Sequence, residues 1–371
     1  APVILVLDAT KVTRTAAAQI LGCMRFDPRV RIAAVLLNRV AGSRHETVLR
    51  GAIEYYCGIP VLGIIPRQKS DLFPERHLGL VPPQESTSHA NTLQFAAELL
   101  RKSVDLESLW QIAKAAERLE GPVNPLTARL KPEPAEPPLV IGVVRDAAFH
   151  FYYPENLEAL EDRGAILRQI SSFESCPLPP IDALYIGGGF PETHLEVLAG
   201  NSVLRASLKE EIEKGLPVYA ECGGLMFLCR GILRNDSTFP MTGIFPFDAV
   251  LEKKPQGHGY TVMECVNSNP FFPEGAVIKG HEFHYSRIVG NYPAFRFVFR
   301  LLRGHGIVPG WDGICYENVL AGYSHIHATG NSDWAEAMIR NARSFRLKRV
   351  AFLPDCRAGP NLSGLAANGF T

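Results

Sequence analysis

Residues 217–228 read PVYAECGGLMFL, and this stretch decides how the second half of the chain folds. The apolar run Pro217–Ala220 is typical of a buried strand in a parallel sheet, and Leu225–Leu228 begins a buried helix. Between them, Gly223–Gly224 allows a tight turn with Cys222 at its apex. A strand that turns directly into a helix predicts an α/β sheet, with the turn at the carboxyl end of the strand.

The chain on either side of this stretch repeats the alternation of strands and helices. Beyond residue 240 the sequence is rich in β-forming residues and broken by glycine, until a final helix. The predicted elements are LVIGVVRD (139–146), YPENLEALEDRGA (153–165), ALYIGGGFPE (183–192), VLRASLKEEIEKG (203–215) and SDWAEAMIRNARSF (332–345). Together they predict an α/β domain.

The first part of the chain has the same character. Its predicted strands are VILVLD (3–8), RIAAVLLNRV (31–40) and IPVLGIIPR (59–67), and its predicted helices are Thr10–Leu21, HETVLRGAIEYYCG (45–58) and the segment 87–120. Strands that alternate with helices predict a parallel, doubly wound sheet. Such sheets bind ligands at the carboxyl ends of their strands, where Asp8, Asn38 and Arg67 stand.

Proline marks the boundary between the two parts. The segment 121–138 contains prolines 122, 125, 132, 134, 137 and 138, which is typical of a semi-rigid linker. We therefore expect one domain over 1–120 and a second over 139–345. The segment 346–371 ends in a run rich in Gly, Pro and Asn, and we expect it to be a loose tail.

Composition and charge exclude several classes of protein. The chain has 38 basic and 38 acidic residues and a formal net charge of +0, which is unlike a protein whose main partner is nucleic acid. Its apolar runs have the length of strands and its first residues open directly into one, so we expect neither a membrane span nor a signal peptide. The 8 cysteines form no CxxC pair, which favours a reduced, cytoplasmic protein without a structural zinc site.

Cys222 has the surroundings that a catalytic thiol needs. Ala220 and Gly224 stand two residues to either side, which is the spacing of small residues around a nucleophile elbow. The N–H groups at the start of the following helix favour a thiolate and can hold an oxyanion. Cys229 lies further along the same predicted helix with no glycine beside it, so we expect it to be a packed core thiol.

A second glycine cluster, Gly187–Gly189, also follows a predicted strand. It lacks the spacing of a dinucleotide-binding loop, and the Gly-Lys-Ser/Thr of a phosphate-binding loop is absent. One interpretation is a loop whose N–H groups at Gly188 and Gly189 point into the site as an oxyanion hole. The alternative is a tight turn with a purely structural role.

Histidines are available as the base that a thiol nucleophile requires. GHEFHYS (280–286) contains His281 and His284, and GYSHIHATG (322–330) contains His325 and His327. Because residues two apart on a strand face the same side, His325 and His327 could line one surface. A histidine pair could also belong to a metal site, but without cysteine or carboxylate ligands nearby a thiol–imidazole pair is favoured. Glu282 and His284 could instead contact substrate.

Several motifs, taken in order, resemble those of one enzyme family. They are PVILVLDA (2–9), LFPERHLGL (72–80), AFHFYYPENLEAL (148–160), GGGFPE (187–192), AECGGLMFL (220–228), GHEFHYS (280–286) and GYSHIHA (322–328). This series resembles the cobyrinic acid and hydrogenobyrinic acid a,c-diamide synthases, over residues 2 to about 345. The resemblance implies an ATP-dependent, glutamine-using carbon–nitrogen ligase of cobalamin biosynthesis.

The resemblance assigns roles in a C-terminal domain similar to class I glutamine amidotransferases. Cys222 would attack the glutamine carboxamide to give a thioester and ammonia, with His325 as the base that activates it. Gly188, Gly189 and Gly223 would bind glutamine and its oxyanion. His327 occupies the place where ordinary class I enzymes have Glu, so the usual third carboxylate is missing at that position.

The resemblance implies a P-loop-NTPase-like, dethiobiotin-synthetase-like N-terminal domain, but an incomplete one. In it ATP and Mg²⁺ would activate the a and c carboxylates as acyl phosphates. The family's P-loop precedes PVILVLDA and is absent from this chain, so we expect either a fragment of a longer protein or a degenerate homologue. Asn38 would face the nucleotide base, and we assign Glu75, Arg76 and His77 to nucleotide or tetrapyrrole binding.

Three other interpretations remain open. One is amidation of nickel sirohydrochlorin instead, and another is a pseudo-enzyme that keeps only the glutaminase half. A cysteine peptidase of the same superfold would share the elbow alone. The expected partners are small molecules, namely glutamine, ATP and tetrapyrrole carboxylates; a homodimer is compatible with the sequence, and no metal ligands are identified.

Overall fold

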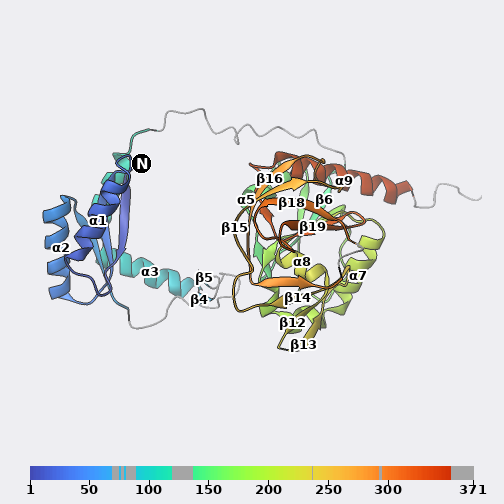
Figure 1. Ribbon diagram of the computed structural model, residues 1–371, viewed down its shortest axis with the longest axis horizontal. Helices are drawn as coiled ribbons and strands as arrows, with labels where there is room; N and C mark the ends of the chain where they lie inside the picture. The colour runs from blue at the N-terminus through green and yellow to red at the C-terminus, as the bar shows by residue number, and fades with distance from the viewer. Residues whose placement is uncertain are drawn as a thin grey trace, which may run out of the picture. The chain divides into compact units, whose positions relative to one another are not determined.

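The chain divides into two compact units, Ala1–Asn124 and Pro125–Thr371 (Figure 1). The computed structural model describes residues 1–68, 75–76, 79–80, 89–118, 137–235, 237–291 and 295–351. The division falls inside the segment 121–138 that the sequence predicts as a linker, most of which lies outside the described residues. Each unit is an α/β structure, as predicted.

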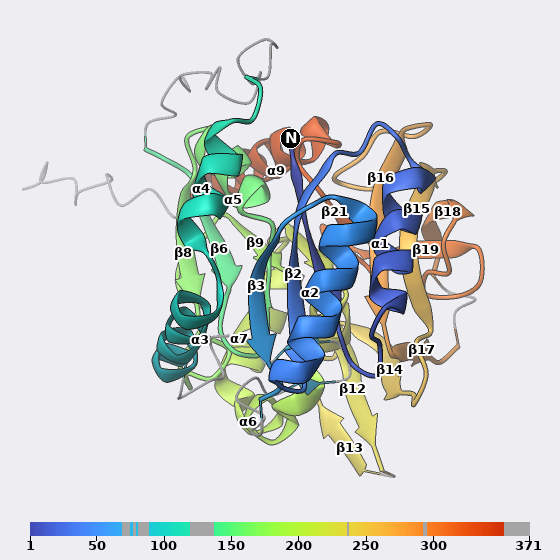
Figure 2. The ribbon, with the colours of Figure 1, turned by 90° about the vertical axis from the view of Figure 1, so that its left-hand side faces the viewer.

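The first unit is built on a parallel sheet of three strands in the order β1-β2-β3. Its elements are β1 (Val3–Asp8), α1 (Thr15–Phe26), β2 (Ile32–Val40), α2 (Ser43–Cys57), β3 (Val61–Pro66), β4 (Glu75–Arg76), β5 (Gly79–Leu80), α3 (His89–Ser103) and α4 (Leu106–Lys114). Alternate residues of β2 point to opposite faces: Val35 and Leu37 pack with α1 and α2, whereas Ala34 and Leu36 pack with Val104 and α4. Figure 2 shows α1 and α2 in front of the strands. Helices on both faces confirm the doubly wound arrangement.

Two helices of the first unit differ from the sequence prediction. The helix expected from Thr10 begins only at Thr15, because the Asp8 carboxylate accepts a hydrogen bond from the Thr10 N–H (2.8 Å) and holds a turn. The helix expected over 87–120 is two helices, separated where Val104 bridges to Gly63 of β3. Asp105 then caps α4 by accepting from the Ser108 N–H (3.0 Å).

The second unit contains a sheet of ten strands in the order β21-β16-β15-β18-β19-β20-β11-β9-β6-β8. The strands from β20 to β8 run parallel, and the strands from β21 to β20 pair antiparallel. The parallel strands are β6 (Val140–Val144), β8 (Ile166–Ile170), β9 (Ala183–Ile186), β11 (Val218–Glu221) and β20 (Val319–Gly322). The others are β15 (Gly257–Cys265), β16 (Val277–His284), β18 (Phe297–Arg303), β19 (Trp311–Tyr316) and β21 (His325–Ile326).

Helices cover both faces of the parallel half of this sheet. One face packs against α6, α7 and α8, and the other against α5 and α9. The helices are α5 (Pro154–Glu161), α6 (Leu195–Gly200), α7 (Ser202–Glu213), α8 (Gly223–Leu228) and α9 (Ser332–Ala351), with a 3₁₀ turn, η3 (Pro191–Thr193). Helix α9 continues six residues into the segment expected to be a loose tail. Its Arg346 is held there by an ion pair with the buried Asp182.

Two smaller sheets complete the second unit. A two-stranded sheet pairs β7 (Phe149–Phe151) with β10 (Gly188–Gly189). A four-stranded sheet has the order β13-β12-β14-β17, with β12 (Cys229–Arg234), β13 (Ser237–Pro240), β14 (Phe245–Leu251) and β17 (Ser286–Val289). Within the described ranges, no helix is long and apolar enough to cross a membrane.

The position of Cys229 corrects one prediction. Helix α8 ends at Leu228, and Cys229 is the first residue of β12 rather than part of the helix. The chain leaves the helix there because Cys229 pairs with Phe245 of β14, and its carbonyl accepts from the Gly243 N–H (2.9 Å). The prediction that it is a core thiol is confirmed, since it is fully buried and burial raises its pKa.

The large sheet curls back on itself. Strand β21 lies at one edge of the ten-stranded order, six places from β11. Nevertheless, the N–H of Ile326 in β21 donates to the carboxylate of Glu221 in β11 (3.1 Å). The curl therefore brings the last strand of the sheet beside the carboxyl end of β11.

Candidate active site

Cys222 stands at a sharp turn between β11 and α8. Its backbone has φ 49° and ψ −99°, a conformation that costs energy in any residue but glycine and is typical of functional sites. Its N–H donates to the Gly322 carbonyl (2.8 Å), and its own carbonyl accepts from Met226 N–H (3.1 Å). At Gly224 a Cβ would lie 2.4 Å from the Ile186 carbonyl oxygen, so a side chain there would clash with backbone. The structure thus contains the predicted elbow.

His325 of β21 lies beside the side chain of Cys222, with which it interacts electrostatically. It is only 5% exposed. Burial disfavours the charged imidazole, but the Cys222 sulfur and the Glu221 carboxylate outweigh it and raise the pKa of His325 to about 10. At neutral pH the ring is therefore a cation, and it can give a proton to a leaving group.

Glu221, the last residue of β11, lies beside His325. Its Oε2 is 3.4 Å from His325 Nδ1 and accepts from the Tyr185 hydroxyl (3.0 Å), while its Oε1 accepts from the Ile326 N–H. The sequence reasoning missed this residue. The available signal was a carboxylate that ends an otherwise apolar, buried strand one position before the thiol.

The glycines predicted for the oxyanion hole converge on the elbow. A Cβ on Gly188 would lie 2.5 Å from Cε1 of His325, so the loop packs directly on the imidazole. A Cβ on Gly223 would lie 3.2 Å from the backbone nitrogen of Gly189, which has φ 155°. Gly223 is also the first residue of α8, where an amide has no acceptor within the helix. Their role as an oxyanion hole stays a prediction.

Aromatic side chains surround the other faces of His325. The Phe151 ring meets it edge-on at 4.9 Å, and the His281 ring stacks on it at 5.0 Å. His281 also hydrogen-bonds the Tyr153 hydroxyl through Nδ1 (3.2 Å). Burial, and then the positive charge of His325, lower the pKa of His281 to about 4, so this ring is neutral at pH 7. His281 and His325 are also register partners where β16 pairs with β21.

The remaining predicted histidines lie in different surroundings. Strand β21 ends at Ile326, so the strand periodicity does not extend to His327. His327 contacts Tyr153 (4.6 Å between rings) and places Nε2 3.4 Å from the Glu155 carboxylate. His284 is 3% exposed, stacks on Tyr323 at 3.6 Å and hydrogen-bonds the Ser286 carbonyl through Nδ1 (2.7 Å). It therefore belongs to the interior rather than to an accessible surface.

The residues predicted for nucleotide or tetrapyrrole binding belong to the first unit. Asn38 lies in β2 two residues before its last residue, as the register partner of Asp8 near the carboxyl edge of the sheet. Hydrogen bonds from Thr10, helped by Arg39, lower the pKa of Asp8. Glu75 and Arg76 form β4, and His77 lies outside the described residues. None of them shares a unit with Cys222.

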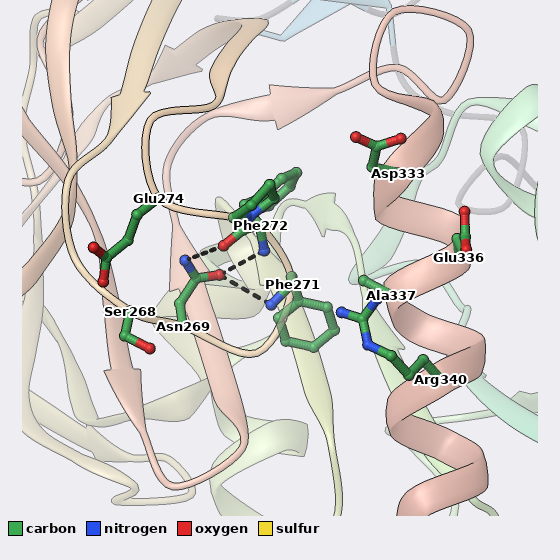
Figure 3. Close-up of a pocket in the computed structure, with 10 residues that line it drawn as sticks. Ser268, Asn269, Phe271, Phe272, Glu274, Asp333, Glu336, Ala337 and Arg340 are labelled. Atoms are coloured by element: carbon green, nitrogen blue, oxygen red, sulfur yellow. Dashed lines mark hydrogen bonds between the residues drawn. The ribbon is translucent and has the colours of Figure 1, made fainter.

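A surface pocket elsewhere in the second unit lacks the thiol and imidazole groups found around Cys222. It has a volume of about 440 Å³ and lies between the loop 268–274 and α9 (Figure 3). Asn269 shapes the loop by accepting from the N–H groups of Phe271 (3.0 Å) and Phe272 (2.9 Å). No cysteine or histidine is among the described residues that line it.

Across the described part of the chain, no three His, Cys, Asp or Glu side chains are grouped as a metal site requires.

The sequence is similar to a known glutamine amidotransferase domain and to several synthases. Residues 140–333 match the CobB/CobQ-like glutamine amidotransferase domain. A cobyrinate a,c-diamide synthase of Magnetococcus marinus is 40% identical over 342 residues, which cover 92% of this chain and 73% of that protein. One from Methanothermobacter thermautotrophicus is 39% identical over 345 residues (93% and 75%). One from Listeria monocytogenes is 38% identical over 327 residues (88% and 71%).

Proposed function

Because the chain belongs to the cobyrinate a,c-diamide synthase family, we propose that it amidates the a and c carboxylates of cobyrinic or hydrogenobyrinic acid in cobalamin biosynthesis. It is a glutamine-dependent, amide-forming ligase. The observation that carries the proposal is Cys222 at a positive-φ elbow beside a buried, cationic His325. This is the arrangement of an activated thiol nucleophile.

The proposed glutaminase reaction follows from this pair. The Cys222 thiolate attacks the carboxamide carbon of glutamine, and the negative charge moves to the carboxamide oxygen, beside the N–H groups of Gly189 and Gly223. His325 gives its proton to the departing nitrogen, so the C–N bond breaks and ammonia leaves a thioester on Cys222. Neutral His325 then takes a proton from water, whose oxygen attacks the thioester to release glutamate and restore the thiolate.

Joining ammonia to a carboxylate requires activation of the carboxylate, so we extend the proposal to ATP and Mg²⁺. Asp8 and Asn38 lie together at the carboxyl edge of the first sheet, and oxygen donors of this kind suit a hard cation. When bound, ATP would supply the phosphoryl group that activates the carboxylate toward ammonia. The sequence contains no Gly-Lys-Ser/Thr loop, so the fit rests on these two side chains. A second candidate is glutamine hydrolysis alone, which needs only the residues around Cys222.

A glutaminase assay on the purified chain tests the first half of the proposal. Cys222→Ala should lower glutamate release by at least about 10³-fold, because it removes the nucleophile. Cys176→Ser changes an exposed cysteine outside the site and serves as the matched control. Wild-type turnover in Cys222→Ala would refute the assignment.

The acceptor is tested separately. Amide formation is followed with ATP, glutamine and either cobyrinic acid, hydrogenobyrinic acid or nickel sirohydrochlorin. Amidation of one of the first two supports the main proposal, and amidation of the nickel compound alone identifies the other acceptor. Glutamate release without amidation of any acceptor supports the glutaminase-only candidate.

A further inference from the structure

The carboxylate of Glu221 is buried in contact with Nδ1 of His325. The side chains of Glu221 and His325 are 3% and 5% exposed, and the two atoms are 3.4 Å apart. Since Nδ1 is directed at Glu221, Nε2 is the ring nitrogen left for the sulfur of Cys222. Within the described chain, His325 is the one cationic side chain paired with Glu221.

A buried network holds this carboxylate in place. The Tyr185 hydroxyl donates to Glu221 Oε2 and accepts from the Asn156 side-chain amide (3.2 Å). The same amide donates to the Ile326 carbonyl (3.0 Å), and the Asn156 side-chain oxygen accepts from the Ala328 N–H (2.7 Å). Asn156 and Tyr185 are both fully buried. The network therefore fixes Glu221 and the backbone that follows His325 relative to each other.

The residue two positions after His325 does not provide the carboxylate that contacts Nδ1. His327 stands there, and its Nε2 pairs with Glu155 while its Nδ1 bonds Thr329. The carboxylate beside His325 comes instead from the strand that carries the nucleophile.

From this geometry we propose that Glu221 is the positioning residue of the thiol–imidazole pair. The inference rests on the proposed glutaminase function. By accepting from Nδ1–H, the carboxylate keeps Nε2 as the nitrogen that exchanges protons with the thiol and the leaving nitrogen. It also stabilises the imidazolium that the reaction requires, as the aspartate does in serine proteases.

Glu221→Gln is the decisive variant. Its amide can donate to Nδ1, which would leave the proton on Nε2 and block proton acceptance there. We expect kcat for glutamine hydrolysis to fall about 10²–10⁴-fold with KM nearly unchanged, as in the corresponding serine protease variant. Glu221→Asp keeps the charge but withdraws it from Nδ1, so it should restore part of the lost kcat. Tyr185→Phe removes a neutral hydrogen-bond donor to the same carboxylate, so it should lower kcat far less than Glu221→Gln does.

The pH dependence of Cys222 alkylation by iodoacetamide gives a readout that a merely structural role would not change. Without the carboxylate the pKa of His325 falls, so reactivity at low pH should be lost in Glu221→Gln. Unchanged kcat and an unchanged alkylation profile in Glu221→Gln would overturn the positioning role of Glu221 but not the proposed function. A wild-type chain without glutaminase activity would overturn the proposed function. If Glu221→Gln does not fold, Glu221→Asp decides: wild-type kcat and profile refute the positioning role, and a lowered kcat at unchanged KM supports it.

Discussion

Substitution of Gly188 by alanine should misplace the imidazole of His325 without removing any reacting group. A Cβ at this position would lie 2.5 Å from Cε1 and 3.3 Å from Nε2 of His325. Carbon atoms in contact are usually about 3.5 Å apart, so the ring and the loop must separate by about 1 Å. A displacement of this size at a catalytic group can lower the rate about 10²-fold. We therefore expect kcat for glutamine hydrolysis to fall about 100-fold in Gly188→Ala.

The assay compares glutamate release by Gly188→Ala with that of a matched control. Gly200→Ala is suitable, because a Cβ at Gly200 meets nothing within 4 Å and the residue lies in α6. It should retain wild-type turnover. Overpacking at Gly188 should also reduce the free energy of unfolding by about 1–3 kcal/mol, which urea titration measures.

Two outcomes would contradict this prediction. A folded Gly188→Ala protein with wild-type kcat would show that His325 need not stay against the glycine loop during turnover. An equal loss in Gly200→Ala would show that the assay reports overall destabilisation instead.

Two further predictions concern buried charge. The pKa of His281 lies at about 4 in the folded protein against an ordinary value of 6.5, so the unfolded chain binds the proton first as pH falls. The wild type should therefore lose stability from pH 6.5 downward until folded His281 itself titrates near 4, and thermal melting of His281→Phe should show a smaller loss over this interval. Arg346→Met should lower the free energy of unfolding by about 3 kcal/mol in urea titration, because it removes the main ion-pair partner of Asp182, which is 1% exposed. The exposed pair of Lys214 and Glu210 is the control, and its loss by Lys214→Met should leave the urea midpoint close to that of the wild type.

Local sequence was sufficient to predict the elbow. Gly224 is needed because a Cβ there would meet the Ile186 carbonyl, and such a steric demand appears directly as a glycine in the sequence. The alternation of apolar strands with helices likewise predicted both α/β units. Cys229 was misplaced because a short apolar run does not distinguish a helix from a strand. Its pairing with Phe245 decided the matter.

Glu221 could not be assigned from the sequence because its contacts are not local. It meets His325 across 104 positions of the chain, and the two strands that carry them are not neighbours in the sheet order. No periodicity encodes how far a sheet curls. The resemblance points instead to the position of His327, where a carboxylate is expected.

The curl of the ten-stranded sheet also has a consequence for biosynthesis of the chain. The thiol is translated about a hundred residues before its base, and contacts of such long range form late because loop closure must precede them. A nascent chain that has reached α8 already contains the cysteine but not β21. Glutamine hydrolysis should therefore begin only when the final strand has joined the sheet, so an incomplete chain releases no ammonia.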